Sequence, residues 1–154
     1  MMSQNFEIAD QPTAAERKLD VFAGRWHSTG NTEPGDGFPG GRMDVMENYE
    51  WLPGETMMVH AFVGKVAGQE CKGVEMLTYD HARGKYFSHF FCNPNVGRVY
   101  EMSVDAAGVW TITGPSERGR LVFEDADNLT GMWERSQDGI KWEPLCDFRM
   151  KRVG

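Results

Sequence analysis

Short turn signals interrupt the chain about every ten residues, and this spacing constrains the fold more than any other feature of the sequence. Glycine, proline, asparagine and aspartate gather at these points because they adopt the backbone angles that tight turns need. The breaks fall at 32–41, 53–54, 67–68, 83–84, 94–97, 107–108, 116–119, 125–128 and 138–139. The segments between them predict roughly ten strands, at 25–31, 42–52, 55–66, 69–80, 85–93, 97–105, 109–114, 119–124, 128–136 and 141–152. Strands with this spacing are typical of an antiparallel sandwich or barrel.

A good helix signal occurs only near the start of the chain. Thr13, with Glu16 three residues later, has the pattern of a capping box, and Gly24 marks the end of the run. Leu19 and Phe22 give this helix of about ten residues an apolar side. We therefore expect a flexible N-terminus at 1–12 and a single all-β domain at 13–154, with the short helix closing one end.

Two of the expected strands, 55–66 and 85–93, are largely apolar on both faces. Both faces are covered when a sheet curls around an interior and its outside is also packed. This pattern predicts a single antiparallel up-and-down β-barrel of about 8–10 strands, and it leaves open whether the sheet closes fully or forms a two-sheet sandwich. The residues expected to line the interior are Tyr49, Trp51, Met58, His60, Phe62, Phe87, His89, Phe91, Tyr100, Met102 and Trp133. Those expected on an outer contact face are Met57, Val59, Ala61, Val63, Phe90 and Cys92.

Composition excludes several classes of partner. The formal net charge of −7 disfavours nucleic acid and anionic membrane surfaces. No apolar run approaches the ~18 residues that a membrane span needs. The three cysteines are widely spaced, and no signal peptide is recognisable, so we expect reduced thiols and a cytoplasmic location. The excess of aromatic residues and methionine is what a ligand-lining or contact surface would need.

A Gly-x-Trp sequence, Gly24-Arg-Trp26, stands at the head of the first strand, and the last strand ends in Asp147-Phe-Arg-Met-Lys-Arg152-Val. These pieces resemble the calycin group, which includes lipocalins, fatty-acid-binding proteins, avidins and nitrobindin-like haem proteins. The stretch 19–153 is similar to family 1579 of the domain-of-unknown-function series. The matching pieces are Phe22-Ala-Gly-Arg-Trp26, the 73–80 and 86–91 strands, and Ser136-Gln-Asp-Gly-Ile-Lys-Trp142. The resemblance implies a lipocalin-like barrel and no particular activity.

Trp26 is the candidate plug at one end of the barrel. The resemblance implies that a basic residue from a late strand packs across this indole. An arginine stacked on a tryptophan adds a cation–π attraction and can donate to carbonyl groups at the rim. Strand parity places Arg152 on the same face as Met150 and favours it, whereas Arg149 becomes the partner only if a bulge shifts the parity. Both roles would be structural.

No motif predicts a metal site or a nucleophile. The four histidines, His27, His60, His81 and His89, lack metal-ligand spacing. In the haem proteins of the resembled group the proximal histidine lies near the C-terminus, and no histidine follows His89 here. Haem is therefore disfavoured, and no cofactor is expected.

Acid–base chemistry is the main enzymatic alternative. A dry barrel interior could hold His60, His89, Glu47, Glu75, Tyr49 or Tyr100 around a substrate. Glu47 and Glu75 lie among apolar neighbours, so each is either paired with an arginine, such as Arg98 or Arg135, or catalytic.

The sequence thus predicts a barrel that binds a small apolar or aromatic molecule. The alternatives are an isomerase, cyclase or hydratase that uses a barrel histidine or carboxylate, and a homodimeric interaction module. Whether the chain is an enzyme stays open at this point, with binding favoured. The expected partners are a small hydrophobic molecule and a second copy of the chain.

Overall fold

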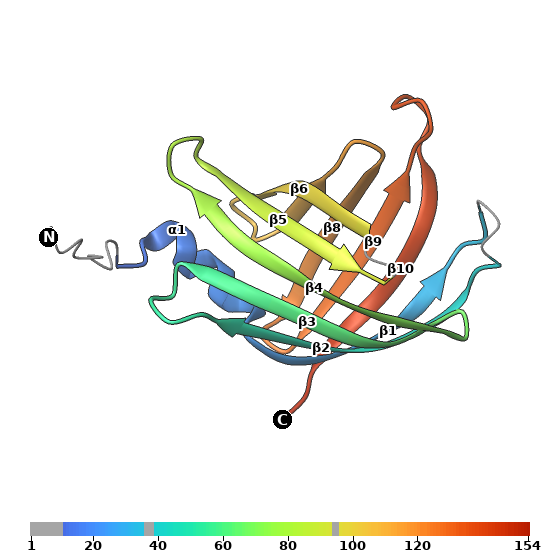
Figure 1. The fold of residues 1–154 in the computed structure, drawn as a ribbon, viewed down its shortest axis with the longest axis horizontal. Helices are drawn as coiled ribbons and strands as arrows, with labels where there is room; N and C mark the ends of the chain where they lie inside the picture. The colour runs from blue at the N-terminus through green and yellow to red at the C-terminus, as the bar shows by residue number, and fades with distance from the viewer. Residues whose placement is uncertain (1–10, 36–38, 94–95) are drawn as a thin grey trace, which may run out of the picture.

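The computed structural model describes residues 11–35, 39–93 and 96–154. Ten strands follow a short helical segment in this part of the chain (Figure 1). They are β1 (Gly24–Thr32), β2 (Gly41–Trp51), β3 (Met57–Val66), β4 (Gln69–Asp80), β5 (Lys85–Cys92), β6 (Val96–Val104), β7 (Trp110–Thr113), β8 (Glu117–Asp125), β9 (Asn128–Arg135) and β10 (Glu143–Arg152). Each corresponds to one predicted strand. The sequence predicts a flexible N-terminus at 1–12, and residues 1–10 of it lie outside the described residues.

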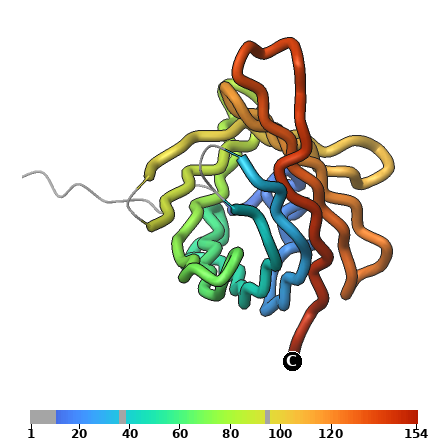
Figure 2. Tube along the Cα trace, turned by 90° about the vertical axis from the view of Figure 1, so that its right-hand side faces the viewer, coloured from blue at the N-terminus to red at the C-terminus, as the bar shows by residue number. Residues whose placement is uncertain are grey.

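The sheet closes on itself. Each strand pairs antiparallel with the next, and β1 also pairs with β10, which completes a closed ring. Figure 2 looks toward the end opposite the helix and shows the strands following one another around this ring. The predicted up-and-down barrel is therefore confirmed, and closure leaves no sheet edge open to pairing with another chain.

The helical segment begins as predicted but has a different form. Thr13 caps it, and its exchange of hydrogen bonds with Glu16 completes the capping box. The α-helix, α1, spans only Ala14–Arg17, and a 3-10 helix, η1, continues over Lys18–Phe22. Leu19 and Phe22 are buried, and their burial holds the segment across one end of the barrel (Figure 1).

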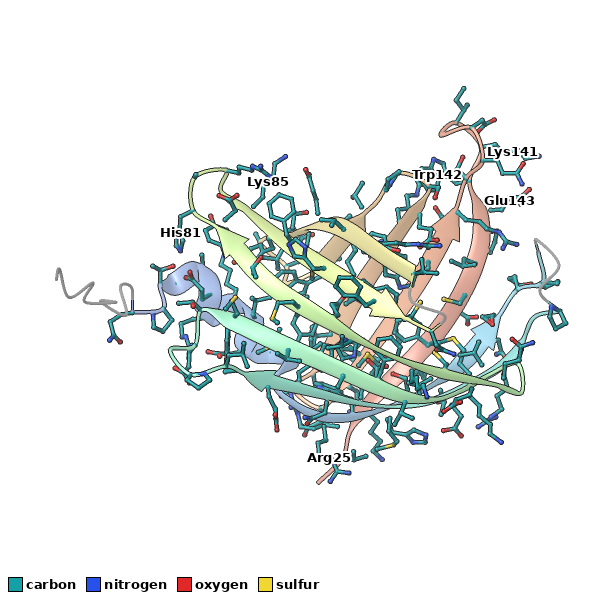
Figure 3. The ribbon with its side chains drawn as sticks, in the orientation of Figure 1. Arg25, His81, Lys85, Lys141, Trp142 and Glu143 are labelled. Carbon is teal, nitrogen blue, oxygen red and sulfur yellow. The ribbon has the colours of Figure 1, made fainter. Side chains whose placement is uncertain are left out.

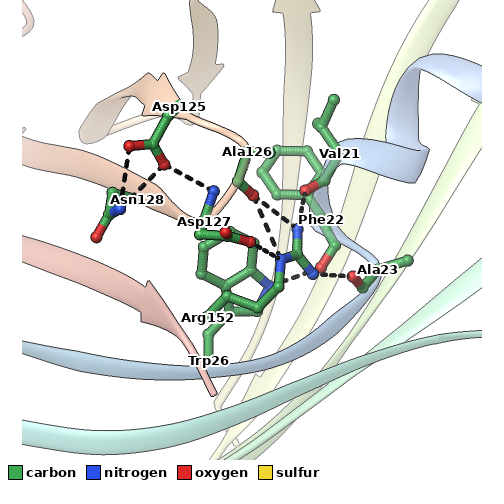
Figure 4. A network of polar contacts seen from close by, with 9 residues as sticks. All are labelled: Val21, Phe22, Ala23, Trp26, Asp125, Ala126, Asp127, Asn128 and Arg152. Atoms are coloured by element: carbon green, nitrogen blue, oxygen red, sulfur yellow. Dashed lines mark hydrogen bonds and ion pairs between the residues drawn. The ribbon is translucent and has the colours of Figure 1, made fainter. Parts of the chain in front are cut away.

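Trp26 plugs the same end from within. Its ring is fully buried, and its indole N–H donates to the carbonyl oxygen of Phe22 at 2.7 Å. The Arg152 guanidinium lies 4.2 Å from the centroid of the Trp26 ring (Figure 4). It also donates to the carbonyl oxygens of Ala23, Val21 at 3.2 Å and Ala126 at 3.0 Å. One cation thus covers the plug and ties η1 to the β8–β9 turn.

The glycine of the Gly-x-Trp sequence, Gly24, is required for steric reasons. Gly24 has a φ of 122°, and a Cβ there would lie 2.5 Å from Nη1 of Arg152. Only glycine leaves room for the guanidinium at this position. Arg149, the alternative partner in the sequence analysis, lies on the outer face and pairs with Glu124 at 3.7 Å.

One strand has its faces reversed relative to the sequence prediction. On β5, Tyr86 and Ser88 are buried inside the barrel, whereas His89 is exposed and Phe91 is 55% exposed. The reason is register. Asp80 pairs with Lys85 across the β4–β5 turn, which sets Glu75 opposite Phe90. Cross-strand partners share a face, so the residues that turn inward are Tyr86, Ser88, Phe90 and Cys92, and those that turn outward are Phe87, His89 and Phe91.

Candidate functional site

The half of the barrel remote from α1 contains a cavity of about 270 Å³. In Figure 3, His81 marks the end that carries α1, and Lys141, Trp142 and Glu143 mark the opposite end. The cavity is lined by Met43, Val45, Glu47, Phe62, Val66, Cys71, Glu75, Phe90, Arg98, Tyr100, Glu117, Trp133, Leu145 and Cys146. A smaller cavity of about 80 Å³ shares Glu47, Glu75 and Trp133 with it and reaches Phe22 at the closed end. The interior is therefore hollow toward one end and packed toward the other.

An aromatic wall runs along one side of the large cavity. Phe62 stacks on Phe90 with ring centroids 5.5 Å apart, and Phe90 meets Tyr100 edge-on at 6.3 Å. Tyr100 meets Trp133 at 5.5 Å, again edge-on. The Trp133 ring lies against Gly119, where a Cβ would come within 2.6 Å of it. Because each ring is fixed by its neighbour, the wall is a preformed apolar surface.

The floor of the cavity is polar. His60 lies between two carboxylates, with Nε2 2.7 Å from Glu47 Oε2 and Nδ1 2.9 Å from Glu75 Oε1. The three side chains are only 9%, 12% and 16% exposed, respectively. Register brings them together, because His60 pairs with Glu75 across β3 and β4, and Glu47 pairs with Phe62, two residues along β3 from His60 and on the same face. The arginine partners expected for these carboxylates are therefore replaced by one histidine.

Further groups hold this arrangement in place. Ser28 donates its hydroxyl to Glu47, and Ser88 donates its hydroxyl to Glu75. The Tyr49 ring stacks on the His60 imidazole with centroids 3.9 Å apart and planes 5° from parallel. Buried charges need such partners, since an unpaired buried charge is strongly unfavourable.

The pKa values follow from these contacts. Burial alone would lower the pKa of His60, but its hydrogen bonds to Glu47 and Glu75 outweigh burial and raise that pKa to about 9. Burial alone would raise the pKa of Glu75, but the hydrogen bond and charge of His60 hold it below its usual 4.5. Burial raises the pKa of Tyr49 well above its usual range. At pH 7 the floor therefore holds an imidazolium beside the ionised carboxylate of Glu75.

The mouth of the cavity carries a second cluster of polar side chains, in addition to the one on the floor. Tyr100 donates its hydroxyl to Glu117 at 2.7 Å, and Arg98 forms an ion pair with the same carboxylate. Burial raises the pKa of Cys146 to about 12 and also raises that of Cys71. Both cysteines are therefore neutral thiols at pH 7 rather than nucleophiles.

The structure brings together some of the predicted lining residues and not others. Those that line one of the two cavities are Tyr49, Phe62, Tyr100, Met102 and Trp133. Met58 and His60 are buried in the interior without lining either cavity. Phe87, His89 and Phe91 were placed on the wrong face, for the register reason given above.

Trp51 also lies elsewhere. It is at the end of β2, where its indole N–H donates to Asp20 at 2.8 Å and Arg17 stacks on its ring at 4.9 Å. Phe90, predicted on the outer face, lines the cavity, and so does Glu117, for which no sequence motif gave a signal.

A sequence profile described as "Protein of unknown function (DUF1579)" matches residues 11–119. No curated protein matches the chain significantly. Among solved structures, the S-type phycobiliprotein lyase CPES from Guillardia theta is similar, with a TM-score of 0.63. The two share 13% sequence identity over 97% of this chain and 98% of that one, so the likeness is one of fold. Within the described residues, no helix has the length and apolar character to cross a membrane.

Proposed function

The chain belongs to the family of proteins of unknown function DUF1579, and this membership implies no activity. From the site itself we propose that the barrel binds a small apolar or aromatic molecule in its cavity. The observation that carries this proposal is the preformed aromatic wall facing a hollow of about 270 Å³ inside a closed barrel. Ligand sites are concave and mostly apolar, with a few placed polar groups, and this interior has that character.

The volume limits the ligand. An apolar cavity of about 150 Å³ accommodates benzene, and pockets for drug-sized ligands are typically about 300–1,000 Å³, so this cavity lies between the two. A space of about 270 Å³ therefore fits a molecule with one ring and a short side chain, or an aliphatic chain of similar size. The small adjoining cavity extends this space only slightly.

Acid–base catalysis is the weaker alternative. The similar structure is a phycobiliprotein lyase, so a barrel of this fold is compatible with an enzyme. However, both nitrogens of His60 face carboxylates, and its raised pKa keeps it protonated at pH 7, so it has no lone pair to serve as a base. The lowered pKa of Glu75 makes it a weak base as well. The floor is suited to holding a ligand more than to removing a proton from it.

Binding is tested with 2-phenylethanol, a neutral one-ring probe, by isothermal titration calorimetry and by native mass spectrometry. We expect one molecule to bind per barrel, and we expect Cys146→Phe, which fills the cavity, to weaken binding at least tenfold. Met132→Phe is the matched control, because Met132 lies on the outer face of the neighbouring strand. Absence of binding, or equal binding by the Cys146→Phe protein, contradicts the proposal.

The outer face of the barrel supports a second proposal, that two copies of the chain associate. Exposed apolar side chains extend across β3 to β6, where Ala61, Val74 and Phe91 are consecutive cross-strand neighbours. Apolar patches of this kind mark contact surfaces. The predicted contact face keeps Met57, Val59, Ala61 and Val63 and loses Phe90 and Cys92, which turn inward. Light scattering should give a dimer mass at high micromolar concentration and a monomer mass for Phe91→Glu. A monomer of the unaltered protein contradicts this proposal.

A further inference from the structure

In the part of the chain that the structure describes, the donors that surround the two carboxylates of the floor already have acceptors there. Both N–H groups of His60 are directed at Glu47 and Glu75. The hydroxyl groups of Ser28 and Tyr49 also donate to Glu47, at 3.5 Å for Tyr49, and that of Ser88 donates to Glu75. Among the described residues, these four side chains leave no N–H or O–H of their own free for a ligand that approaches the floor.

The two carboxylates have acceptor capacity to spare. A carboxylate offers about four lone-pair sites. The described side chains supply three hydrogen bonds to Glu47 and two to Glu75. Both carboxylates also line the large cavity. A ligand that reaches the floor therefore meets acceptors, so it has to bring donors of its own.

The charge of the site points the same way. On the floor, the positive charge of His60 balances only one of the carboxylates Glu47 and Glu75. At the mouth, Arg98 and Glu117 balance each other. The cavity therefore carries one uncompensated negative charge in a poorly hydrated place, where charges interact more strongly than in water. Aromatic rings add to this preference, since their faces attract cations.

We propose that the cavity selects an organic amine, with a protonated amino group on an apolar body of about one ring. The ammonium group would donate to Glu47 and Glu75, and the ring would lie against Phe62, Phe90 and Tyr100. His60 would act as a positioning residue that holds the two carboxylates apart. This inference rests on the proposed binding function and adds the chemical class of the ligand.

The inference excludes an organic anion as the preferred ligand. Such a molecule would place its carboxylate beside Glu47 and Glu75. Arg98, a cation at the mouth, is already paired with Glu117. Any anion that approached Arg98 would therefore also meet the negative charge of Glu117.

The test compares three probes of similar size at pH 7: 2-phenylethylamine, 2-phenylethanol and 3-phenylpropionate. Calorimetric titration of the unaltered protein should show the amine binding at least tenfold more tightly than the alcohol, and the anion most weakly. Equal affinities for amine and alcohol, or tighter binding of the anion, overturn the inference while leaving the binding function in place. If none of the probes binds, both fail.

Substitution of the floor sharpens the test. Glu75→Gln keeps the shape and removes the uncompensated charge, so it should weaken amine binding at least tenfold and weaken alcohol binding by a clearly smaller factor. Glu101→Gln is the matched control, because it removes one charge from the outer surface, where Glu101 pairs with Lys85. An equal loss for both probes in Glu75→Gln overturns the inference. The comparison of three probes on the unaltered protein decides the question even if the variant folds poorly.

Discussion

Replacing His60 with leucine is expected to lower the free energy of unfolding by about 3–5 kcal/mol, because the substitution leaves two buried carboxylates without their shared cation. The hydrogen bonds from Ser28 and Ser88 remain, but two negative charges would then face each other across the space that the imidazolium fills. This is a larger effect than the loss of packing alone. Urea unfolding at pH 7 measures it.

His27→Leu is the matched control. His27 also pairs with one carboxylate, Asp44 at 2.8 Å, but these side chains are 38% and 54% exposed, respectively. Exposed pairs contribute about 0–1 kcal/mol, so this variant should stay close to the parent protein. Adding Glu47→Gln and Glu75→Gln to His60→Leu should recover a large part of the loss. Equal unfolding free energies for His60→Leu and His27→Leu would contradict the buried ion network.

The pH profile gives this prediction a second readout. The folded-state pKa of His60, about 9, exceeds its usual 6.5. Its stabilising contribution is therefore complete below pH 6.5, declines as pH rises and is gone above about pH 9. The pKa values of Glu75 and Glu16 are lowered from 4.5, that of Glu16 to about 2, so their contributions are complete above pH 4.5 and decline in acid. Stability should peak between pH 4.5 and 6.5.

The His60→Leu protein should behave in the opposite way in acid. Without the imidazolium, burial raises the pKa of the carboxylates on the floor. A group whose folded-state pKa is raised stabilises the fold at low pH and loses that contribution as pH rises. The unfolding temperature of the variant should therefore rise as pH falls from 7 to 5. That of the parent protein should change little over the lower part of that range.

The strands of the barrel were predictable because their signals are local, whereas closure depends on the pairing of β1 with β10, the two ends of the chain's sheet. Turn residues set the ends of the strands, and alternation showed two strands apolar on both faces. The helix was predictable in its start, since Thr13 and Glu16 form a local pair. Its 3-10 continuation depends on how Leu19 and Phe22 fit the barrel end, which no local pattern reports.

The site was only partly predictable, because it depends on register. The two-residue turn Ala67-Gly68 pairs Val66 with Gln69, and counting back along both strands sets His60 opposite Glu75. The same counting from the 81–84 turn sets Phe90 opposite Glu75 and turns His89 outward. Register could therefore have found the ion network and corrected the face of β5. The position of the Trp51 side chain could not be predicted from register, since its contacts are with the helical segment.

Removing the plug at the closed end is the other substitution with a large expected effect. Trp26→Ala should lower the free energy of unfolding by about 3–5 kcal/mol, the usual cost of truncating a fully buried aromatic residue. The substitution leaves a void beside Phe123, whose ring centroid lies 6.3 Å from that of Trp26. It also leaves the carbonyl group of Phe22 without its donor. Urea unfolding measures this loss.

Arg152→Lys and Arg149→Lys separate the closure of the barrel from mere positive charge. Lysine keeps the charge at position 152 but lacks the planar fork that reaches Val21, Ala23 and Ala126 together, so the loss should be about 1–2 kcal/mol. The Arg149 side chain is 74% exposed, and the same substitution there should change stability by less than about 0.5 kcal/mol. If the two variants unfold alike, the stacked guanidinium does not stabilise the closed end, and Trp26 is held by burial alone. A selective loss at position 152 means that the cation over the indole stabilises the plug.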